Sequence, residues 1–314
     1  MTPRGDIVVL TRIWPSAERP SLGTFVRDRV RGVDGLRVVH PGSRPGPWPL
    51  LYARLAWDTL RVRRPRGIEA HVLAPTGLLG WLVARLRRVP LLVYAHGGDA
   101  RDWERQRQPR RWATRFVATH ADRVVTNSED TARHLRRMGI EPLVAPPGID
   151  LSRFRPSPRP AARGSVLYLG GLTPRKGYAV AARLATTLVG PGLGEVDPAE
   201  VPALIAAHDV VLVPSRDEPF GIVAVEAIAS GRWVVAAAVG GLREIVVDGV
   251  NGSLISDGDY AAALEAVPEY DPVSVARTAE RFSLQRWQAD LARAWAQLTA
   301  DERDAGARPS PDAA

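Results

Sequence analysis

Short apolar runs alternate with helix-like stretches along nearly the whole chain of 314 residues, and this alternation constrains the fold more than any other feature. The apolar runs are nearly continuous, as in Val210–Val213, instead of alternating with polar residues. Strands that are buried on both faces of a parallel sheet have this pattern, and the stretches between them form crossover helices. The sequence therefore predicts an α/β protein built on parallel sheets.

The predicted elements fall into two groups on either side of a proline-rich segment, which contains Pro156, Pro158 and Pro160 and belongs to no helix or strand. Before it we expect strands over residues 6–10, 36–40, 70–73, 91–95, 123–126 and 142–145, with helices over 25–32, 51–61, 78–87, 110–120 and 129–138. After it we expect strands over 165–169, 186–189, 210–213, 233–237 and 252–255, with helices over 178–185, 199–208, 221–230, 241–247, 259–267, 272–281 and 284–298.

These two groups predict two domains, over residues 1–155 and 156–282, that face each other across a cleft. Ligands of open α/β sheets bind beyond the carboxyl ends of the strands, so the cleft is the expected site. A closing helix follows over residues 283–300, and Ser283 is suited to cap its start. The polar tail over residues 301–314 contains glycine and proline, and we expect it to be disordered.

Composition excludes several classes of protein. The chain has no cysteine, which rules out disulfides, a thiolate metal site and a cysteine nucleophile. It has no apolar run long enough to span a membrane and no signal-peptide pattern at its start, so we expect a cytoplasmic protein. No Gly-x-Gly-x-x-Gly fingerprint follows the first strand, which argues against a nicotinamide enzyme. The six histidines show no metal-ligand spacing, so we expect no metal site.

Charge is distributed unevenly between the two halves. Residues 1–155 hold 28 basic and 14 acidic side chains, whereas the remainder holds 14 basic and 20 acidic ones. This excess favours an anionic partner for the first half, although a coding bias toward arginine on solvated faces would produce the same count. Of the 42 basic side chains only Lys176 is a lysine, which draws attention to that position.

The segment after the strand 210–213 has the strongest chemical pattern. A loop carries Glu218, and the helix that follows it carries Glu226 eight positions later, so both carboxylates could line one crevice. The helix starts after Gly221, and its free N–H groups with their partial positive charge suit phosphate oxygens. By spacing alone, the two glutamates could equally be solvated surface acids.

The wider context of this segment resembles a known family. Residues 214–235 and 239–252 are similar to the donor-binding half of retaining GT-B glycosyltransferases of family 4, whose two-glutamate motif is matched at Glu218 and Glu226. Further matches cover the phosphate-binding turn, the interdomain crossing, the sugar-facing loop and the first glycine loop, in residues 166–177, 144–156, 94–99 and 21–27 respectively. The resemblance extends to about Leu298. It implies two Rossmann-like domains, with the closing helix packed back toward the N-terminal one.

The resemblance also implies roles for individual residues. Lys176 would hold the diphosphate of a nucleotide sugar, Glu218 would contact the transferred sugar, and His96 would face that sugar from the N-terminal domain. Glu226 would accept hydrogen bonds from the ribose hydroxyls. The remaining donor-binding positions it implies are Gly23, Gly170, Arg175, Ser215, Phe220, Gly221 and Ile222, with a further tight turn at Gly240 and Gly241. The nucleotide sugar is a substrate, and no cofactor is expected. Without the resemblance, His96 has a second interpretation, because a histidine that follows an apolar strand is often structural.

Two departures from the family pattern leave a second function open. The family's first phosphate turn has an arginine where this chain has Gly171, and Arg175 or Arg216 is left to replace its charge. The segment between Thr187 and Asp209 is short, which predicts a C-terminal domain with one strand fewer. Both departures are compatible with a catalytically weak or inactive relative that acts as a partner subunit.

The basic N-terminal domain is the expected acceptor-binding domain. Residues 51–66 and 105–116 interleave arginines with Trp57, Trp112 and other apolar side chains, as in segments that contact anionic lipid. We therefore expect a glycan, lipid or small-molecule acceptor, with an anionic membrane surface as a possible partner. Helices packed on their own sheet with arginines outside would show the same pattern. Nucleic-acid binding is not expected, because the chain has no motif for it.

Overall fold

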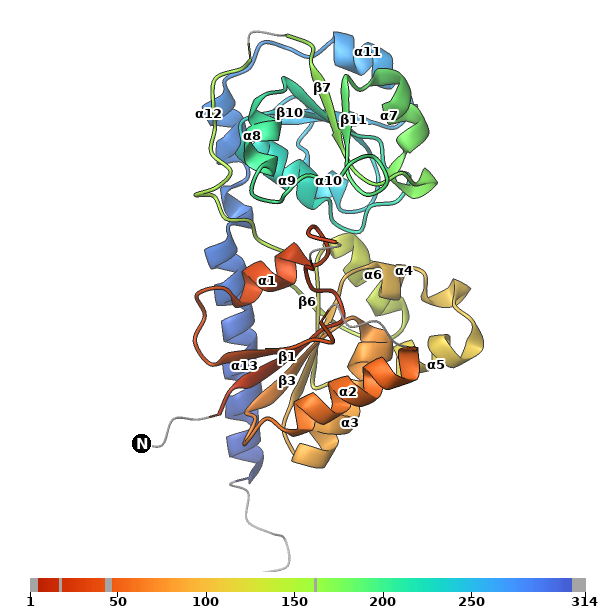
Figure 1. The fold of residues 1–314 in the computed structure, drawn as a ribbon, viewed down its shortest axis with the longest axis vertical. Coiled ribbons are helices and arrows are strands. Elements are labelled where there is room, and N and C mark those ends of the chain that lie inside the picture. The colour runs from red at the N-terminus through yellow and green to blue at the C-terminus, as the bar shows by residue number, and fades with distance from the viewer. Residues whose placement is uncertain (1–4, 17–18, 43–46, 161–162, 307–314) are drawn as a thin grey trace, which may run out of the picture.

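The computed structural model describes residues 5–16, 19–42, 47–160 and 163–306 and arranges them in two stacked domains (Figure 1). Each domain consists of one parallel sheet with helices on both faces, which confirms the predicted fold of two Rossmann-like domains. Most strands lie within a residue of their predicted positions, because continuous apolar runs mark strands that are buried on both faces.

The N-terminal sheet has the order β2-β1-β3-β4-β5-β6 in the described residues. Its strands are β1 (Ile7–Leu10), β2 (Leu36–Val39), β3 (Gly67–His71), β4 (Leu91–Ala95), β5 (Arg123–Thr126) and β6 (Leu143–Val144). The helices of this domain are α1 (Thr24–Val30), α2 (Trp48–Leu60), α3 (Leu78–Arg87), α4 (Gly98–Arg101), α5 (Gln108–His120) and α6 (Glu129–Arg137). Short helical turns over Leu73–Gly77 and Trp103–Arg105, and helix α4, were not expected from the sequence.

Strand β3 was predicted at residues 70–73, but it runs from Gly67 to His71. The prediction missed the start of the strand because it required apolar residues, and Glu69 is buried completely there. The Glu69 carboxylate is tolerated there because the Arg29 guanidinium lies 3.3 Å from it inside the protein. A buried ion pair therefore replaces the apolar signal on which the prediction depended.

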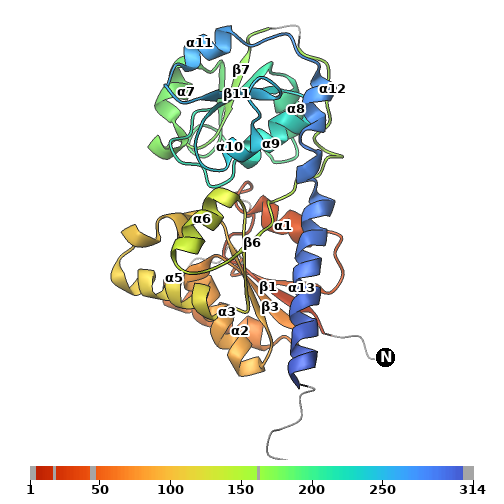
Figure 2. The ribbon, with the colours of Figure 1, turned by 180° about the vertical axis from the view of Figure 1, so that it is seen from behind.

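The two faces of the N-terminal sheet are covered by different helices. Helices α2, α3 and α5 lie together on one face, where they bury residues such as Leu55, Val83 and Val117. The opposite face is covered by the long helix α13 (Leu284–Gly306), through a buried row that includes Trp287, Leu291 and Trp295 (Figure 2). The closing segment of the chain thus completes the core of the first domain.

The C-terminal sheet has the order β11-β10-β9-β7-β8 and, in the described part of the chain, one strand fewer than the N-terminal sheet. It consists of β7 (Val166–Leu169), β8 (Thr187–Val189), β9 (Val210–Val213), β10 (Trp233–Ala237) and β11 (Gly252–Ile255). The helices are α7 (Tyr178–Leu184), α8 (Val201–Ala206), α9 (Ile222–Ala229), α10 (Leu242–Ile245), α11 (Tyr260–Glu265) and α12 (Pro272–Arg277), with short turns over Pro174–Lys176 and Glu280–Phe282. These five strands correspond to the five predicted for this domain.

The proline-rich segment between the domains is extended, and two arginines hold it against the C-terminal domain. The buried Arg232 guanidinium donates to the carbonyl oxygens of Ser157 and Pro158, at 2.8 and 3.0 Å. Arg159 pairs with the buried Asp209 at 2.8 Å. The segment is therefore a fixed strap, which limits how far the domains can separate near it.

Helix α13 begins as predicted at Leu284, where the backbone N–H of Arg286 donates to Ser283 Oγ at 3.4 Å. Its end was predicted at residue 298, but its backbone continues to Gly306. Residues 301–306 were therefore wrongly assigned to a disordered tail on the basis of their polarity. The rest of the predicted tail, residues 307–314, lies outside the described residues.

Candidate functional site

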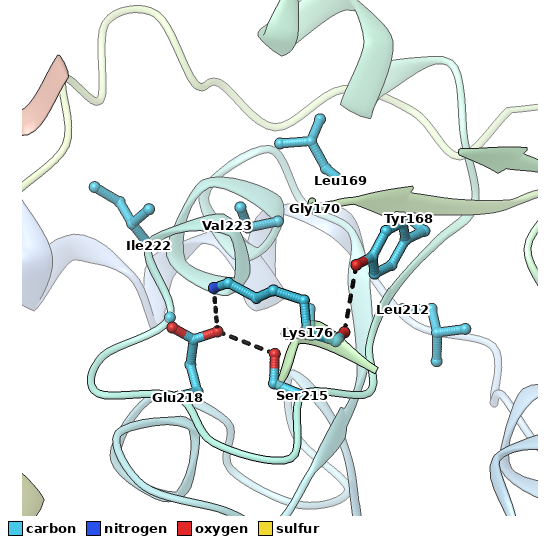
Figure 3. A pocket seen from close by; sticks show the side chains of 11 residues that line it. Tyr168, Leu169, Gly170, Lys176, Leu212, Ser215, Glu218, Ile222 and Val223 are labelled. Atoms are coloured by element: carbon cyan, nitrogen blue, oxygen red, sulfur yellow. Dashed lines mark hydrogen bonds and ion pairs between the residues drawn. The ribbon is translucent and has the colours of Figure 1, made fainter. Parts of the chain in front are cut away.

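A pocket opens at the carboxyl ends of β7 and β9 in the C-terminal domain (Figure 3). It brings together six of the predicted site residues from four separate segments. Its lining consists of Tyr168, Leu169, Gly170, Lys176, Leu212, Val213, Ser215, Glu218, Gly221, Ile222 and Val223. The location agrees with the general rule that open α/β sheets bind ligands beyond the carboxyl ends of their strands.

An ion pair lies at the centre of this pocket. The Lys176 ammonium is 2.7 Å from a Glu218 carboxylate oxygen, and the Ser215 hydroxyl donates to the same oxygen at 3.0 Å (Figure 3). The Lys176 side chain keeps about a third of its surface exposed, whereas Glu218 is nearly buried. The ammonium is therefore accessible to an incoming anion, and the carboxylate is held in place behind it.

Lys176 is positioned by a tight helical turn after β7. The Thr173 hydroxyl accepts a hydrogen bond from the Lys176 backbone N–H at 3.3 Å. Gly177 ends the turn with φ +72°, and a Cβ atom there would lie 1.8 Å from the Pro214 carbonyl oxygen. Only glycine fits this position, so the turn packs directly on the loop that carries Ser215 and Glu218.

The loop that carries Glu218 is clamped from the other side by the Gly240–Gly241 turn. The Gly241 N–H donates to the Glu218 carbonyl oxygen at 2.9 Å, and a Cβ atom at Gly240 would approach that oxygen to 2.1 Å. The close approach predicted for these glycines is made to the site's own loop. It fixes the backbone of Glu218 before any ligand binds.

Helix α9 begins at Ile222, directly beside the ion pair, and Gly221 precedes it with φ +110°. The N–H groups of the first helical turn have no acceptor within the helix, and they carry the positive end of its dipole. The pocket therefore presents an ammonium and a helix N-terminus to the same small volume. This combination suits an anion with several oxygens, such as a diphosphate.

Tyr168 is a pocket residue that the sequence analysis missed. Its hydroxyl donates to the Gly171 carbonyl oxygen at 2.8 Å and lies 3.4 Å from the Lys176 carbonyl oxygen, so it ties the two loops together. Burial, together with the nearby Glu218 carboxylate, raises the pKa of Tyr168 to about 12. A tyrosine in a strand is ordinarily core, and nothing in the sequence distinguished this one.

Glu226 lies one and a half turns into α9 and does not line the pocket. Its side chain is only partly exposed, and desolvation raises its pKa to about 8, with Arg153 opposing this shift and Asp28 adding to it. Asp28 belongs to α1 of the other domain. This carboxyl group is therefore largely neutral at pH 7 in the ligand-free protein.

Three other predicted residues have different surroundings. Phe220 is buried and packs edge-on against Phe282, so only its backbone is available to a ligand. Arg175 is half exposed, lies 3.6 Å from Asp217, and does not line the pocket. Gly23 precedes α1 with φ +72°, and a Cβ atom there would collide with the Ile13 backbone. The structure thus explains the glycine at position 23 by packing within the N-terminal domain.

The N-terminal domain contacts the site through the loop after β4. This loop carries His96, and a Cβ atom at the next residue, Gly97, would lie 2.2 Å from the Pro219 side chain. The Ser128 hydroxyl, at the start of α6, donates to the Pro219 carbonyl oxygen at 2.7 Å. His96 and Glu218 are therefore each adjacent in sequence to the contact between the domains.

Two further interactions join the domains beside this contact. The Arg101 guanidinium of the N-terminal domain lies 2.6 Å from the Asp217 carboxylate of the C-terminal domain. The Glu244 carboxylate of the C-terminal domain accepts hydrogen bonds from the backbone N–H groups of Glu129 and Asp130, at 2.9 and 2.8 Å. A side chain of one domain thus caps helix α6 of the other.

The described ranges contain neither a candidate metal site nor a helix suited to cross a membrane. No three His, Asp or Glu side chains there are grouped so that they could hold a metal ion. None of the helices described is both long and apolar enough to span a membrane.

Comparison with known proteins identifies the class that this fold and site define. Residues 4–153 match the family model described as Glycosyltransferase Family 4, and residues 192–270 match that described as Glycosyl transferases group 1. The chain belongs to these family 4 glycosyltransferases and has their GT-B fold.

Named relatives agree with this class. A D-inositol 3-phosphate glycosyltransferase of Geodermatophilus obscurus is 34% identical over 75% of this chain and 67% of its own length. The protein of that name from Mycobacterium tuberculosis is 32% identical over 60% of this chain, which spans only about half of that relative's length.

Solved structures share the fold. Alr3699/HepE of Anabaena, in complex with UDP and glucose, has a TM-score of 0.73 at 21% identity, covering 93% of this chain and 99% of that one. Sucrose-phosphate synthase of Thermosynechococcus elongatus has a TM-score of 0.73 at 20% identity, covering 95% and 100%.

Proposed function

We propose that the protein is a retaining glycosyltransferase that transfers a sugar from a nucleotide diphosphate sugar to an acceptor hydroxyl. One observation carries the proposal. The exposed Lys176 ammonium and the N-terminus of α9 converge on one pocket, and the pocket's Glu218 loop touches the loop of His96 from the other domain. A diphosphate in this pocket would put the attached sugar near the domain contact, within reach of groups from both domains.

The reaction requires little covalent chemistry from the protein. The bond between the sugar's anomeric carbon and the diphosphate oxygen breaks, and the acceptor oxygen forms a bond to that carbon on the same face. The acceptor's proton passes to the leaving phosphate oxygen. The protein's task is to position the reactants and to stabilise the negative charge that develops on the diphosphate, for which Lys176 and the N–H groups of α9 are suited.

A ligand screen followed by a transfer assay tests this proposal. We expect one of UDP, GDP, ADP or TDP to raise the melting temperature, because a ligand at a hundred times its dissociation constant adds about 2.7 kcal/mol of stability. The matching nucleotide sugar should then be consumed, and the product should keep the donor's anomeric configuration. No stabilisation by any of the four nucleotides would contradict the proposed donor site.

For the acceptor, we propose a molecule whose hydroxyl lies near a phosphate group. Two findings support this choice. The first 155 residues hold twice as many basic as acidic side chains, and the curated relatives are named for D-inositol 3-phosphate. Competition assays with a free polyol phosphate and with a phosphate-containing lipid distinguish the two sources of such an acceptor. An acceptor without any phosphate that outperforms both would contradict it.

We further propose that the surface formed by α2 and α5 rests on an anionic membrane. Trp48, Trp57 and Trp112 are each more than half exposed on these helices. The guanidinium of Arg61 lies over the Trp57 ring at 4.9 Å, so the surface pairs aromatic side chains with positive charge. Exposed tryptophans next to arginines suit the interface between lipid headgroups and acyl chains.

Sedimentation with liposomes tests this membrane contact. We expect more protein to sediment with anionic than with neutral vesicles, and less of the variant that carries Trp57→Ala and Trp112→Ala together. Equal sedimentation with both kinds of vesicle would contradict it.

The alternative function is that of a partner subunit without turnover of its own. The glycine at position 171 and the short segment between Thr187 and Asp209 favour it, because both depart from the family pattern and the first removes a positive charge expected to contact the diphosphate. If the protein binds a nucleotide but neither transfers nor hydrolyses the sugar of any nucleotide sugar, this result supports the partner subunit over the enzyme.

A further inference from the structure

A chain of buried polar groups lies behind His96. His96 follows β4, and its Nε2 atom lies 2.8 Å from Nδ1 of His71, at the end of the neighbouring strand β3. The other ring nitrogen of His71, Nε2, lies 3.4 Å from a carboxylate oxygen of Glu69. Glu69 and His71 are both fully buried, whereas His96 keeps some exposure. We call Glu69, His71 and His96 the imidazole chain.

Glu69, at the inner end of the imidazole chain, is held as a charged acceptor. Its second carboxylate oxygen accepts hydrogen bonds from Trp295 Nε1 at 2.8 Å and from Arg29 at 3.3 Å. Burial alone would raise the pKa of Glu69, but the Arg29 charge and the contacts with His71 and Trp295 lower it to about 2. A carboxylate in this state can only accept hydrogen bonds.

This state of Glu69 fixes which nitrogens carry protons further along the chain. The Glu69 oxygen and the His71 Nε2 atom are buried 3.4 Å apart, and neither has a hydrogen-bonding partner elsewhere in the part of the chain that the structure describes. A proton on His71 Nε2 is the arrangement that turns a donor toward the carboxylate, and in a neutral ring Nδ1 is then an acceptor. That acceptor faces His96 Nε2, which consequently carries a proton and leaves His96 Nδ1 unprotonated.

The packing around the chain holds the rings in place. The Tyr94 ring stacks on His96 with the centroids 4.5 Å apart and on His71 at 5.7 Å. Phe25 of α1 covers His96 at 4.8 Å. Burial lowers the pKa of His96 well below its usual value, so this ring is neutral at pH 7. For a neutral imidazole, the tautomer decides which nitrogen accepts a hydrogen bond.

We propose that Glu69 and His71 are positioning residues that hold His96 in the tautomer protonated at Nε2, so that Nδ1 accepts a hydrogen bond from a hydroxyl of the transferred sugar. The part that concerns the sugar rests on the proposed function. The tautomer itself is a property of the ligand-free protein and is measured without any substrate. The two parts can therefore fail separately.

The tautomer is tested by long-range 1H–15N correlation spectra of the full chain labelled with 15N-histidine. The signals of His96 are assigned by their loss in His96→Gln. We expect Nε2 of His96 to have the nitrogen shift of a protonated ring nitrogen and Nδ1 that of an unprotonated one. The opposite tautomer, an even mixture, or a doubly protonated His71 that donates to His96 would overturn the proposal.

Two polar variants of His71 separate positioning from simple packing. In His71→Asn the amide oxygen lies where Nδ1 was, so the tautomer of His96 should be kept. In His71→Gln the amide reaches the position of Nε2 instead, so the tautomer should be lost. The exposed His120→Gln is the control for the removal of an imidazole elsewhere in the same domain.

Kinetics of the same variants test the link to the sugar. We expect kcat/KM for transfer to fall about tenfold in His71→Gln and much less in His71→Asn, the cost of one misplaced hydrogen bond. The affinity for the nucleotide alone should be unchanged in both, because its pocket lies in the C-terminal domain. Equal losses in the two variants would overturn the positioning role, whereas a wild-type protein that binds no nucleotide would contradict the proposed function instead.

Discussion

The ion pair between Lys176 and Glu218 makes the two residues competitors as well as partners. In the ligand-free protein the ammonium is satisfied by the carboxylate at 2.7 Å, and a diphosphate must take over part of that interaction. Glu218 therefore holds Lys176 in position but weakens its attraction for the nucleotide. Substitutions of the two residues should have opposite effects on nucleotide affinity, although both should reduce transfer.

Lys176→Ala should weaken binding of the nucleoside diphosphate by roughly tenfold to 150-fold, because a hydrogen bond to a charged group contributes about 1.5–3 kcal/mol. It also leaves the Glu218 carboxylate unpaired beside the diphosphate, and most transfer should be lost. Titration calorimetry measures the affinity. Arg183→Ala, an exposed arginine of α7 outside the pocket, is the matched control for the loss of one positive charge. Unchanged turnover in Lys176→Ala would refute the site.

Glu218→Gln removes the competing charge and should leave nucleotide affinity unchanged or higher, while transfer falls steeply because the sugar loses its contact. The same calorimetric titration, paired with the transfer assay, separates the two effects. A loss of affinity as large as that of Lys176→Ala would show that Glu218 helps to bind the diphosphate, contrary to this account.

The raised pKa of Glu226 predicts that nucleotide binding releases a proton. Its pKa is raised to about 8 in the ligand-free protein, so it is mostly protonated at pH 7. Hydrogen bonds from ribose hydroxyls favour the charged form and lower the pKa, so binding should release up to about one proton and strengthen between pH 6 and 8. Calorimetry in buffers of different ionisation enthalpy counts the proton. If Glu226→Gln releases as many protons on binding as the wild-type protein, Glu226 is not the source of the released proton.

At the scale of elements, the sequence predicts best where burial and polarity agree. Strands β4, β9 and β10 were placed correctly because each is a continuous apolar run. The start of strand β3 was missed because the strand buries the charged Glu69. Together with His71 and His96, Glu69 forms the imidazole chain, which was missed because its contacts join neighbouring strands and helix α13, and no local pattern encodes them.

Helix α13 should be necessary for the stability of the N-terminal domain, since it covers one face of that domain's sheet. Leu291 is fully buried there, and Leu291→Ala should lower the free energy of unfolding of that domain by about 2–5 kcal/mol. Denaturant unfolding followed by tryptophan fluorescence measures it. The exposed Gln297→Ala, on the same helix, should change stability by less than about 0.5 kcal/mol. Similar values for the two variants would contradict this role of α13.

At the scale of the whole molecule, the proposed donor pocket belongs to one domain and His96 to the other, so under this proposal the contact between the domains determines whether the site is complete. The pocket could be predicted from the resemblance to the family, because Lys176 and Glu218 lie in motifs that are specific to it. The interdomain contacts of Glu244 and Arg101 could not, because each joins residues more than a hundred positions apart.

Glu244→Ala should loosen the contact between the domains. The carboxylate caps helix α6 of the other domain, and the loss of a cap costs about 0.5–2 kcal/mol, which shifts an opening equilibrium by roughly twofold to thirtyfold. Small-angle X-ray scattering should show a larger radius of gyration than for wild type. The exposed Glu265→Ala, in the same domain, is the control. Scattering identical to wild type would show that the cap does not hold the domains together.

A crystal structure with the nucleoside diphosphate that stabilises the protein tests the central claim most directly. The account predicts that the diphosphate oxygens contact the Lys176 ammonium and the backbone N–H groups at the start of α9, with the Lys176–Glu218 distance lengthened. A nucleotide bound elsewhere, or an unoccupied pocket with the ion pair unchanged, would contradict it.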